Sequence, residues 1–242
     1  MTFAYDGTMF SGYQKQPKLR TVQAEIEKAL KKVNSNGLIK IYASGRTDAG
    51  VHAYSQKAHF DMEPKITPEN MVASLNSLLP PDLFIKKIES VKDNFDARRS
   101  AKAKEYLYKI NLGPYEPTMR NLVYQYNKPL DIVAMQRALK YFEGEHNFKS
   151  FTKNTEVKET FVRNIIQTNL LRDIKDLNQI TLVFLGNGFL RYQVRNMVGT
   201  LIEIGEGKRK PESIIDILNL ADRTYAGITA HPEGLYLNDV YY

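Results

Sequence analysis

The stretch "GRTDAGVHA" (residues 45–53) holds a single carboxylate, Asp48, between two glycines. A lone acid in such a segment fits a turn, a phosphate-binding loop, a metal ligand or a nucleophile. The phosphate-loop interpretation fails because no Lys-Ser/Thr pair follows the second glycine. The metal interpretation is weak because the chain has no cysteine and its four histidines form no helical pair. We therefore expect ordinary strand, loop and cap histidines, and no metal site.

A second acid or a hydroxyl nucleophile would give Asp48 a different chemistry. A pair of carboxylates, as in glycosidases, needs a partner, and nothing in the sequence selects among candidates such as Asp61 or Asp96. A Ser-His-acid arrangement lacks the nucleophile-elbow motif. An Asp followed by Ala-Gly between two strands is also typical of an Asx-turn. From this stretch alone, a structural turn and a nucleophile both remain open.

A carboxylate nucleophile has to stay ionised inside a cleft, which a neighbouring arginine favours. The stretch "FLRYQVRNMVG" (189–199) supplies Arg191 and Arg195, one helical turn apart at the start of an otherwise apolar helix. Arg195 borders the apolar side of this helix, and a half-buried arginine requires an acid partner. The alternative is an arginine whose side chain extends along the helix to water.

The composition of the 242-residue chain is that of a globular protein, with 43% hydrophobic and 25% charged residues. No apolar run is long enough for a membrane helix, and the N-terminus lacks the features of a signal peptide. The absence of cysteine suits the cytoplasm. A net charge of +7 and a pI near 9.3 favour a polyanionic partner such as nucleic acid. The 15 tyrosines can stack on bases or simply fill strands and core.

Hydrophobic periodicity in the first half predicts alternating strands and helices. The order is β-α-β-β-α-β, which is the ferredoxin-like pattern. Thr21 and Thr67 are the expected N-caps of the two helices, and Pro68 suits the first helical turn. The expected strands are residues 2–6, 38–44, 55–62 and 83–91, and the expected helices are residues 21–33 and 67–79.

The second half predicts a similar order with one helix added. The expected strands are 104–112, 160–172, 178–185 and 234–242, and the expected helices are 131–144, capped by Asp131, 191–205 and 211–220. We therefore predict an α+β protein of two ferredoxin-like lobes, residues 1–97 and 98–242, with a largely antiparallel sheet. A central cleft between lobes is the expected place for a large ligand. The polar, basic stretch 92–103 is the expected hinge.

The segment "SGRTDAGVHA" (44–53) resembles the signature of the tRNA pseudouridine synthase A family. The resemblance continues in order along essentially the whole chain. An isolated Asp-Ala-Gly motif would be weak evidence, whereas this ordered set is specific. The further matching segments are "FAYDGTMFSGYQKQP" (3–17), "RTVQAEIEKAL" (20–30), "SLNSLLPPDL" (74–83), "FDARRSAKAKEYLYKI" (95–110), "FEGEHNFKSF" (142–151), "FLRYQVRNMVGTL" (189–201) and "GLYL" (234–237).

The resemblance implies an isomerase that converts uridine to pseudouridine on the 3′ side of the tRNA anticodon stem-loop (tRNA positions 38–40). It implies the pseudouridine synthase fold with a central RNA-binding cleft, no cofactor, and a cytoplasmic homodimer that binds tRNA across both subunits. The matching positions are Asp48 as the nucleophile and Arg195 as its ion-pair partner. They also include Tyr106, stacked on the target base, and Arg46, which helps to displace that base.

General chemistry agrees with these roles. A paired uridine must leave the helical stack before any group can reach its C6 or C1′. The Tyr106 ring can stack on uracil, and its hydroxyl can take or relay a proton. Tyr108 shares a strand face with Tyr106, and we expect it to belong to a cross-strand aromatic ladder. Candidate phosphate contacts, or alternatively solvated surface charges, lie in two basic runs: Arg98, Arg99, Lys102 and Lys104, and Lys208, Arg209 and Lys210.

Two departures from the family pattern leave the choice of substrate open. Tyr13 stands where the family usually has Trp, and His231 stands where it more often has a Pro-rich turn. The alternatives are a pseudouridine synthase for rRNA or several RNAs, a catalytically idle RNA-binding protein, and a nucleoside hydrolase with a second acid. The presence of Asp48, Tyr106 and Arg195 argues against the idle protein. Attack on C6, attack on C1′ and a glycal route are equally compatible with the sequence.

Overall fold

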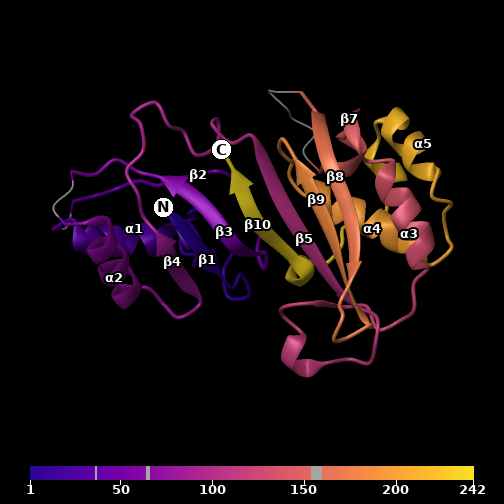
Figure 1. Ribbon diagram of the computed structural model, residues 1–242, viewed down its shortest axis with the longest axis horizontal. Coiled ribbons are helices and arrows are strands. Elements are labelled where there is room, and N and C mark those ends of the chain that lie inside the picture. The colour runs from indigo at the N-terminus through magenta and orange to yellow at the C-terminus, as the bar shows by residue number, and fades with distance from the viewer. Residues whose placement is uncertain (36, 64–65, 154–159) are drawn as a thin grey trace. The chain divides into compact units, whose positions relative to one another are not determined.

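The computed structural model describes residues 1–35, 37–63, 66–153 and 160–242. The chain divides into two compact units (Figure 1): unit 1 comprises Met1–Lys102 and Tyr236–Tyr242, and unit 2 comprises Ala103–Leu235. Each unit combines helices with a mainly antiparallel sheet, so the predicted α+β class is confirmed. Among the described residues, no helix is long and apolar enough to cross a membrane.

Unit 1 begins with the six elements that the sequence predicts, in the predicted order. They are β1 (Thr2–Tyr5), α1 (Val22–Val33), β2 (Tyr42–Ala43), β3 (His52–His59), α2 (Pro68–Leu78) and β4 (Leu83–Lys87). Strand β1 lies between β3 and β4 and is antiparallel to both, and β2 pairs antiparallel with β3. The last strand of the chain, β10 (Leu235–Tyr241), runs parallel to β3, with Tyr236 opposite His52. Unit 1 therefore contains both ends of the chain.

Unit 2 has a sheet in the order β5-β9-β8-β7, with antiparallel neighbours throughout. A two-residue strand, β6, pairs in parallel with β5. Helix α4 is buried along nearly its whole length, and α3 packs beside it. The elements are β5 (Ala103–Asn111), β6 (Tyr124–Gln125), α3 (Ile132–Lys140), β7 (Gly144–Asn147), β8 (Val162–Arg172), β9 (Gln179–Gly186), α4 (Gln193–Gly205) and α5 (Ser213–Leu220), with 3₁₀ turns at Pro117–Met119, Lys149–Phe151, Arg223–Tyr225 and Pro232–Gly234.

The predicted helix caps are confirmed in two of three helices. The Thr67 hydroxyl accepts a hydrogen bond from the Asn70 N–H at 3.3 Å, with Pro68 in the first turn. The Asp131 carboxylate accepts one from the Ala134 N–H at 2.9 Å. Thr21 does precede α1, but its buried hydroxyl makes no capping bond and has no hydrogen-bond partner within the described part of the chain. Its role as a side-chain cap was therefore wrongly predicted.

The predicted strand at residues 38–44 is shorter than expected, because only Tyr42 and Ala43 pair with β3. The preceding backbone bonds to side chains of α1 instead. The Ile41 N–H donates to Glu27 Oε1 at 3.4 Å, and the Ile41 carbonyl accepts from Gln23 Nε2 at 3.4 Å. Apolar alternation alone cannot distinguish a strand from an extended segment that satisfies its backbone groups in this way.

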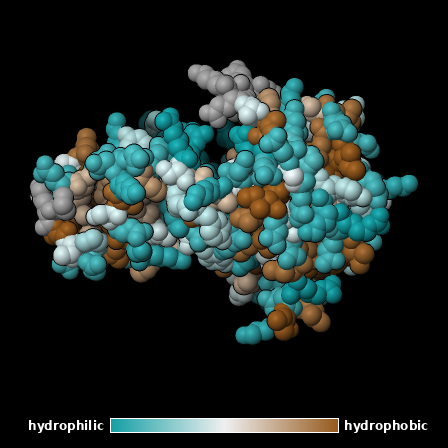
Figure 2. All heavy atoms as spheres, turned by 45° about the horizontal axis from the view of Figure 1, so that its top comes forward, coloured by the Kyte–Doolittle hydropathy of each residue, from teal (hydrophilic) through white to brown (hydrophobic). Residues whose placement is uncertain are grey.

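Large apolar side chains fill the interior of each unit, as the hydrophobic effect requires. Phe3, Ile26 and Leu75 are fully buried in unit 1. In unit 2 the rings of Phe142, Phe148 and Phe151 contact one another, with centroid distances of 5.2 to 6.4 Å. The visible face in Figure 2 is mostly hydrophilic, with hydrophobic residues in separate patches.

The Tyr13 hydroxyl is buried and has no hydrogen-bond partner among the described residues. Burial raises the pKa of this phenol above its ordinary range. We expect Tyr13→Phe to leave the free energy of unfolding unchanged or raise it by about 1 kcal/mol, because an unsatisfied buried hydroxyl is removed. Tyr5→Phe is the matched control and should lower it by about 1 kcal/mol, because the Tyr5 hydroxyl pairs with Thr47 Oγ1 at 2.8 Å. Urea unfolding measures both, and a marked loss of stability in Tyr13→Phe would contradict this assignment.

Candidate active site

Asp48 lies in a tight turn between β2 and β3. Its carbonyl accepts a hydrogen bond from the Val51 N–H at 3.2 Å, which closes a four-residue turn. Gly50, the third residue of that turn, has φ +76°, a backbone angle that glycine adopts without strain and that type II turns require. A turn at the predicted place is therefore confirmed, and the bond that closes it comes from the backbone carbonyl of Asp48. The turn fixes the backbone of Asp48 and leaves its side chain only partly buried.

A neighbouring loop of unit 1 packs directly against the backbone of the Asp48 turn. The Tyr13 N–H donates to the Thr47 carbonyl at 3.1 Å. Gly12 comes so close that a Cβ there would lie 3.0 Å from the Thr47 oxygen and 3.4 Å from the carbonyl carbon of Asp48. A side chain at residue 12 would therefore displace the turn, which explains the glycine.

Hydrogen bonds of buried polar side chains support the Asp48 turn. Thr47 Oγ1 pairs with the Tyr5 hydroxyl at 2.8 Å. Ser44 Oγ donates to Gln56 Oε1 at 2.7 Å, and Gln56 Nε2 donates to the Gly45 carbonyl at 3.1 Å. Arg46 is exposed between the buried Ser44 and Thr47. These supporting roles were missed in the sequence. Ser44 and Thr47 lie in the matching segment 44–53, but neither residue type shows which buried partner it will meet.

Arg20 and Asp82 fix the other end of the loop that supports Asp48. The Arg20 guanidinium donates to both Asp82 oxygens at 2.7 Å, and it lies 4.1 Å from the centre of the Phe10 ring. This bidentate contact with Asp82 is the main cause of the raised pKa of Arg20. The Arg20 carbonyl also accepts from the Ser11 N–H at 2.9 Å. The result is a pre-organised support for the Asp48 turn.

In unit 2, Arg195 lies in the first turn of α4 and is fixed by the segment that precedes β10. Its Nε donates to the Ala230 carbonyl at 2.7 Å, and its own carbonyl accepts from the Ala230 N–H at 3.1 Å. A guanidinium has further N–H donors with which it can bind an anion. Backbone contacts thus fix the direction of the Arg195 side chain, which is only partly buried.

The segment that holds Arg195 passes very close to α4 at Gly199. A Cβ at Gly199 would lie 1.7 Å from the Ile228 carbonyl oxygen, so any side chain must push the segment away. We expect Gly199→Ala to lower the free energy of unfolding by about 3 kcal/mol because of this backbone clash. In the control Gly188→Ala, the new Cβ meets nothing nearer than 3.8 Å, and a change below about 0.5 kcal/mol is expected. Equal stability of the two variants in urea unfolding would show that the close approach is absent.

Asn196 is a buried amide that ties the same segment to α4. Its Oδ1 accepts from Thr229 Oγ1 at 2.7 Å and from the Arg223 guanidinium at 3.0 Å, and its Nδ2 donates to the Phe151 carbonyl at 2.7 Å. Burial lowers the pKa of Arg223. This network was not predicted, because its members lie far apart in the sequence and an Asn beside Arg195 gives no sign of its distant partners.

Tyr192 is an unexpected residue beside Arg195. It precedes α4 with φ 64°, a left-handed conformation that bulky residues rarely adopt. The cationic groups of Lys153, Arg191 and Arg195 lie 5.0 to 5.4 Å from its ring centre. The start of α4 therefore gathers three positive charges near one aromatic ring, an arrangement suited to an anionic ligand.

Tyr106 and Tyr108 lie on the same face of β5 but have different surroundings. Tyr106 stands opposite Phe184 on β9, and its ring meets the Phe189 ring edge-on with 5.1 Å between centroids. Tyr108 is fully buried, donates its hydroxyl to the His231 carbonyl at 2.7 Å, and meets the Tyr124 ring edge-on. The structural role expected for Tyr108 is confirmed, but the cross-strand aromatic ladder is present only toward Tyr124 on β6, because Leu182 stands opposite Tyr108 on β9.

The described residues contain no group of three or more His, Asp or Glu side chains arranged to hold a metal ion. His52 accepts the Gly7 N–H on Nδ1 at 3.0 Å, and His59 accepts the Ala97 N–H on Nδ1 at 3.0 Å. His231 precedes a 3₁₀ turn and stacks on Tyr124. His146 Nε2 is 2.8 Å from the Glu143 carbonyl. These contacts match the strand, loop and cap positions predicted for the histidines.

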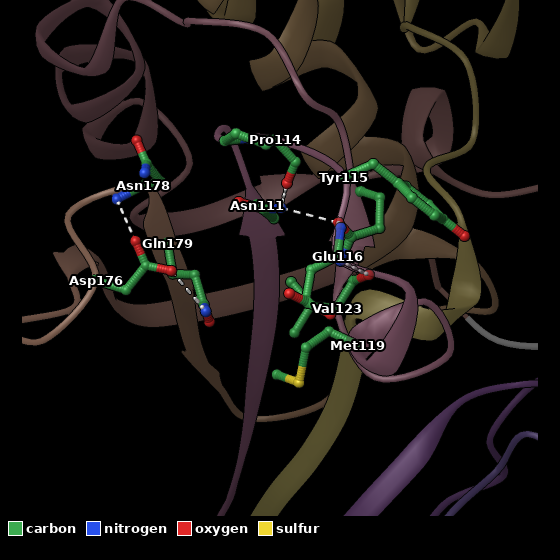
Figure 3. A pocket seen from close by; sticks show the side chains of 10 residues that line it. Asn111, Pro114, Tyr115, Glu116, Met119, Val123, Asp176, Asn178 and Gln179 are labelled. Carbon is green, nitrogen blue, oxygen red and sulfur yellow. Dashed lines mark hydrogen bonds between the residues drawn. The ribbon is translucent and has the colours of Figure 1, made fainter.

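Unit 2 also contains a pocket of about 270 Å³ that is unrelated to the predicted residues (Figure 3). Its polar groups largely bond to one another: Asn111 Nδ2 donates to the Pro114 carbonyl and to Gln125 Oε1, both at 2.8 Å. It contains none of Arg46, Asp48, Tyr106 and Arg195. The lining residues are Asn111, Pro114, Tyr115, Glu116, Met119, Val123, Gln125, Asp176, Asn178 and Gln179.

The four predicted site residues come from both units. Arg46 and Asp48 lie in the same short segment of unit 1 between β2 and β3, so their proximity follows from the local chain. Tyr106, on β5, and Arg195, on α4, belong to unit 2. In each unit a rigid backbone positions the predicted residues, and this is the local requirement for a catalytic site.

Comparison with known proteins gives these residues a context. The family described as tRNA pseudouridine synthase matches residues 1–98 and 138–242, which include Arg46, Asp48 and Arg195. A tRNA pseudouridine synthase A of Geobacillus sp. (strain WCH70) is 45% identical over 242 residues, covering 100% of this chain and 96% of that protein. One from Streptococcus equi subsp. equi (strain 4047) is also 45% identical, over 99% of this chain and 96% of its own.

A third relative, tRNA pseudouridine synthase A 1 of Bacillus cereus (strain ATCC 14579), is 43% identical over 100% of this chain and 97% of its own length. These relatives extend over residues 99–137, where the family match is interrupted and where Tyr106 lies. Similarity of this extent leaves no part of either unit unaccounted for, and the chain belongs to the tRNA pseudouridine synthase family.

Proposed function

We propose that this protein isomerises uridine to pseudouridine in tRNA. The observation that carries the proposal is the full-length similarity to proteins named tRNA pseudouridine synthase A. Asp48 in a rigid turn and Arg195 fixed by backbone contacts supply the side chains that such a reaction needs. The basic character of the chain, with a net charge of +7, suits an RNA substrate.

The reaction breaks the N1–C1′ bond of uridine and forms a C5–C1′ bond. The hydrogen of C5 is lost as a proton, and N1 gains one, so substrate and product have the same atoms and oxidation state. No co-substrate is therefore required. Asp48 is the nucleophile, which attacks C6 of the uracil or C1′ of the ribose, unless loss of the C2′ proton first gives a glycal. In each route the carboxylate has to be ionised.

The other three residues serve Asp48 and the base. Arg195 pairs with the carboxylate and keeps it anionic. Tyr106 stacks on the target uracil, and its hydroxyl takes or relays the C5 proton. Arg46, exposed beside Asp48, takes the place of the nucleotide that leaves the stack, which lowers the cost of base flipping.

We further assign the substrate uridines to the 3′ side of the anticodon stem-loop, and the working form to a cytoplasmic homodimer. Both assignments rest on the sequence resemblance. The two units are assigned as ferredoxin-like lobes, which the strand order β4-β1-β3 supports for unit 1. A central RNA-binding cleft stays a prediction from sequence. Sedimentation of the 27.8 kDa chain tests the dimer directly, because a monomer at micromolar concentration would contradict it.

The function is tested by incubating the protein with unmodified tRNA transcripts and mapping pseudouridine by mass spectrometry. Isolated anticodon stem-loops and rRNA fragments are assayed in parallel. We expect pseudouridine in tRNA and in the stem-loop. Modification of rRNA alone would show that rRNA is the substrate. If no RNA gains pseudouridine, the proposed activity is wrong, and the alternative of a catalytically idle RNA-binding protein is favoured.

A further inference from the structure

We infer that residues 95–102, here called the Arg98 loop, form an RNA-phosphate contact of unit 1, and that Lys208 and Arg209 of the second basic run do not bind RNA. This inference deepens the proposed function and rests on it. Arg98, Arg99 and Lys102 are exposed. Within the described part of the chain, no ion pair joins any of the three side chains to an acid. The Arg99 charge is the smallest of the causes that lower the pKa of the Asp96 carboxyl, so the three charges are largely available to a polyanion.

The backbone of the Arg98 loop is built in a fixed shape. Asp96 Oδ1 accepts the N–H groups of Arg98 and Arg99, both at 2.8 Å. The Ser100 N–H donates to the Asp96 carbonyl at 2.8 Å, and Ser100 Oγ accepts the Asp96 N–H at 3.1 Å. The hydrogen bonds from the N–H groups of Arg99 and Arg98 lower the pKa of the Asp96 carboxyl, so it stays ionised as a cap. Asp96 is therefore occupied within the loop and is a poor candidate for a second catalytic acid.

The loop is also anchored to the sheet of unit 1. Ala97 is completely buried; its N–H donates to His59 Nδ1 at 3.0 Å, and its carbonyl accepts from the Tyr242 hydroxyl at 2.8 Å. The Lys102 N–H donates to the Tyr241 carbonyl at 2.8 Å. Ordering the backbone in advance reduces the entropy lost when the cationic side chains bind RNA.

A row of aromatic rings lies against the same loop. Tyr42 stacks on His59 at 5.2 Å, His59 meets Phe95 edge-on at 6.3 Å, and Phe95 lies 4.9 Å from Tyr242. The rings at the two ends are exposed, Tyr42 by 53% and Tyr242 by 37%. Exposed aromatic rings beside unpaired cations are typical of surfaces that bind RNA, where bases stack and phosphates pair. An acidic protein could form ion pairs with the cations, but it has no bases to stack on the exposed rings.

The second basic run has a different environment. Lys208 Nζ lies 2.8 Å from Glu206 Oε2, and Arg209 Nε lies 2.5 Å from Glu203 Oε2. The hydrogen bond from Lys208 to Glu206 is the main cause of the raised pKa of that lysine. Two acids thus pair with Lys208 and Arg209, and phosphates would have to displace them. Lys210 is exposed and forms no ion pair among the described residues, so it is the cation of this run with available charge. The sequence presents the two runs as equivalent, whereas their surroundings differ.

The test measures the affinity for an unmodified tRNA transcript at several KCl concentrations, using the full-length chain. The variant Arg98→Gln/Arg99→Gln/Lys102→Gln is compared with its matched control, Lys208→Gln/Arg209→Gln/Lys210→Gln. We expect the first variant to reduce the slope of log K against log salt by about 2 and to weaken binding roughly tenfold or more at 0.1 M salt. The control removes one cation without an acid partner, Lys210, and should lower the slope by less than about 1.

A separate variant tests the aromatic row. Tyr42→Leu is expected to weaken tRNA binding by about fivefold or more without changing the salt slope, because stacking releases no counterions. If a triple variant unfolds by circular dichroism, the single changes Arg98→Gln and Arg99→Gln replace it, each expected to lower the slope by about 0.8.

Equal slopes for the two triple variants would overturn the inference, as would unchanged tRNA affinity in the Arg98-loop variant. The latter result would point to an acidic protein as the partner. The binding readout is independent of turnover. If the unmodified protein forms no pseudouridine while the Arg98-loop variant loses tRNA affinity, the proposed function fails and the RNA surface stands. If pseudouridine forms and the slopes are equal, only the surface fails.

Discussion

Asp48→Asn is expected to reduce pseudouridine formation by at least about 1,000-fold while tRNA affinity changes by less than about threefold. An amide has the shape of the carboxylate but is neither charged nor nucleophilic. The turn that presents residue 48 is held by the backbone of Asp48 and by Thr47, Gly50 and Val51. The substitution should therefore remove the chemistry and leave the turn, and with it the RNA surface, intact.

Single-turnover assays with excess enzyme measure this loss without interference from product release. Asp61→Asn is the matched control, because Asp61 is an exposed acid close in sequence that a paired-carboxylate mechanism could use. We expect that variant to retain full activity. Turnover by Asp48→Asn would exclude Asp48 as the nucleophile, and loss of activity in both variants would indicate a mechanism with two acids.

Arg195→Ala should lower the rate by roughly 100-fold or more, with tRNA binding largely kept. Loss of a cation from beside a carboxylate raises the pKa of that carboxylate by about 1 to 3 units. In the proposed ion pair, Asp48 would then lose the cation that favours its ionised form. The residual activity of the variant should accordingly rise with pH over a range where the unmodified protein has already reached its plateau.

The pH profile distinguishes this electrostatic role from a purely structural one, which would lower activity equally at every pH. Arg191→Ala is the control, because Arg191 also lies by the Tyr192 ring but stands before the helix and is exposed. Its effect should stay below about tenfold. Normal turnover in Arg195→Ala, or a pH profile parallel to that of the unmodified protein, would contradict the proposed ion pair.

Local sequence signals were sufficient wherever the physical cause was itself local. The helix that starts at Pro68 was predicted from a Thr cap and a proline in the first turn. The structure has both the capping hydrogen bond of Thr67 and the proline in that turn. Asp131 likewise caps α3. The Asp-Ala-Gly turn follows from a glycine at the position where positive φ is needed. These features depend on residues three or four positions apart, which a sequence displays directly.

Predictions from local sequence were wrong where a distant segment forms hydrogen bonds with the same backbone groups. Residues 38–41 have the apolar character of a strand, yet Ile41 bonds to side chains of α1. Thr21 has the right type and position for a cap, but its hydroxyl is buried without a partner in the described structure. The parallel pairing of β10 with β3 joins residues far apart in the chain. Loop closure over such distances leaves no periodic trace in the sequence.

The sequence by itself determined the family, the α+β class, most of the helices and the identity of the residues proposed for chemistry. Only the tertiary structure decided what supports these residues: Gly12 and Thr47 pack against the Asp48 turn, and the Ala230 carbonyl binds Arg195. It also decided which surface cations have acid partners, because Glu206 and Glu203 pair with Lys208 and Arg209. The physical reason is that a residue's type sets the chemistry it can perform. Its burial, partners and available charge depend on segments that meet only when the chain folds.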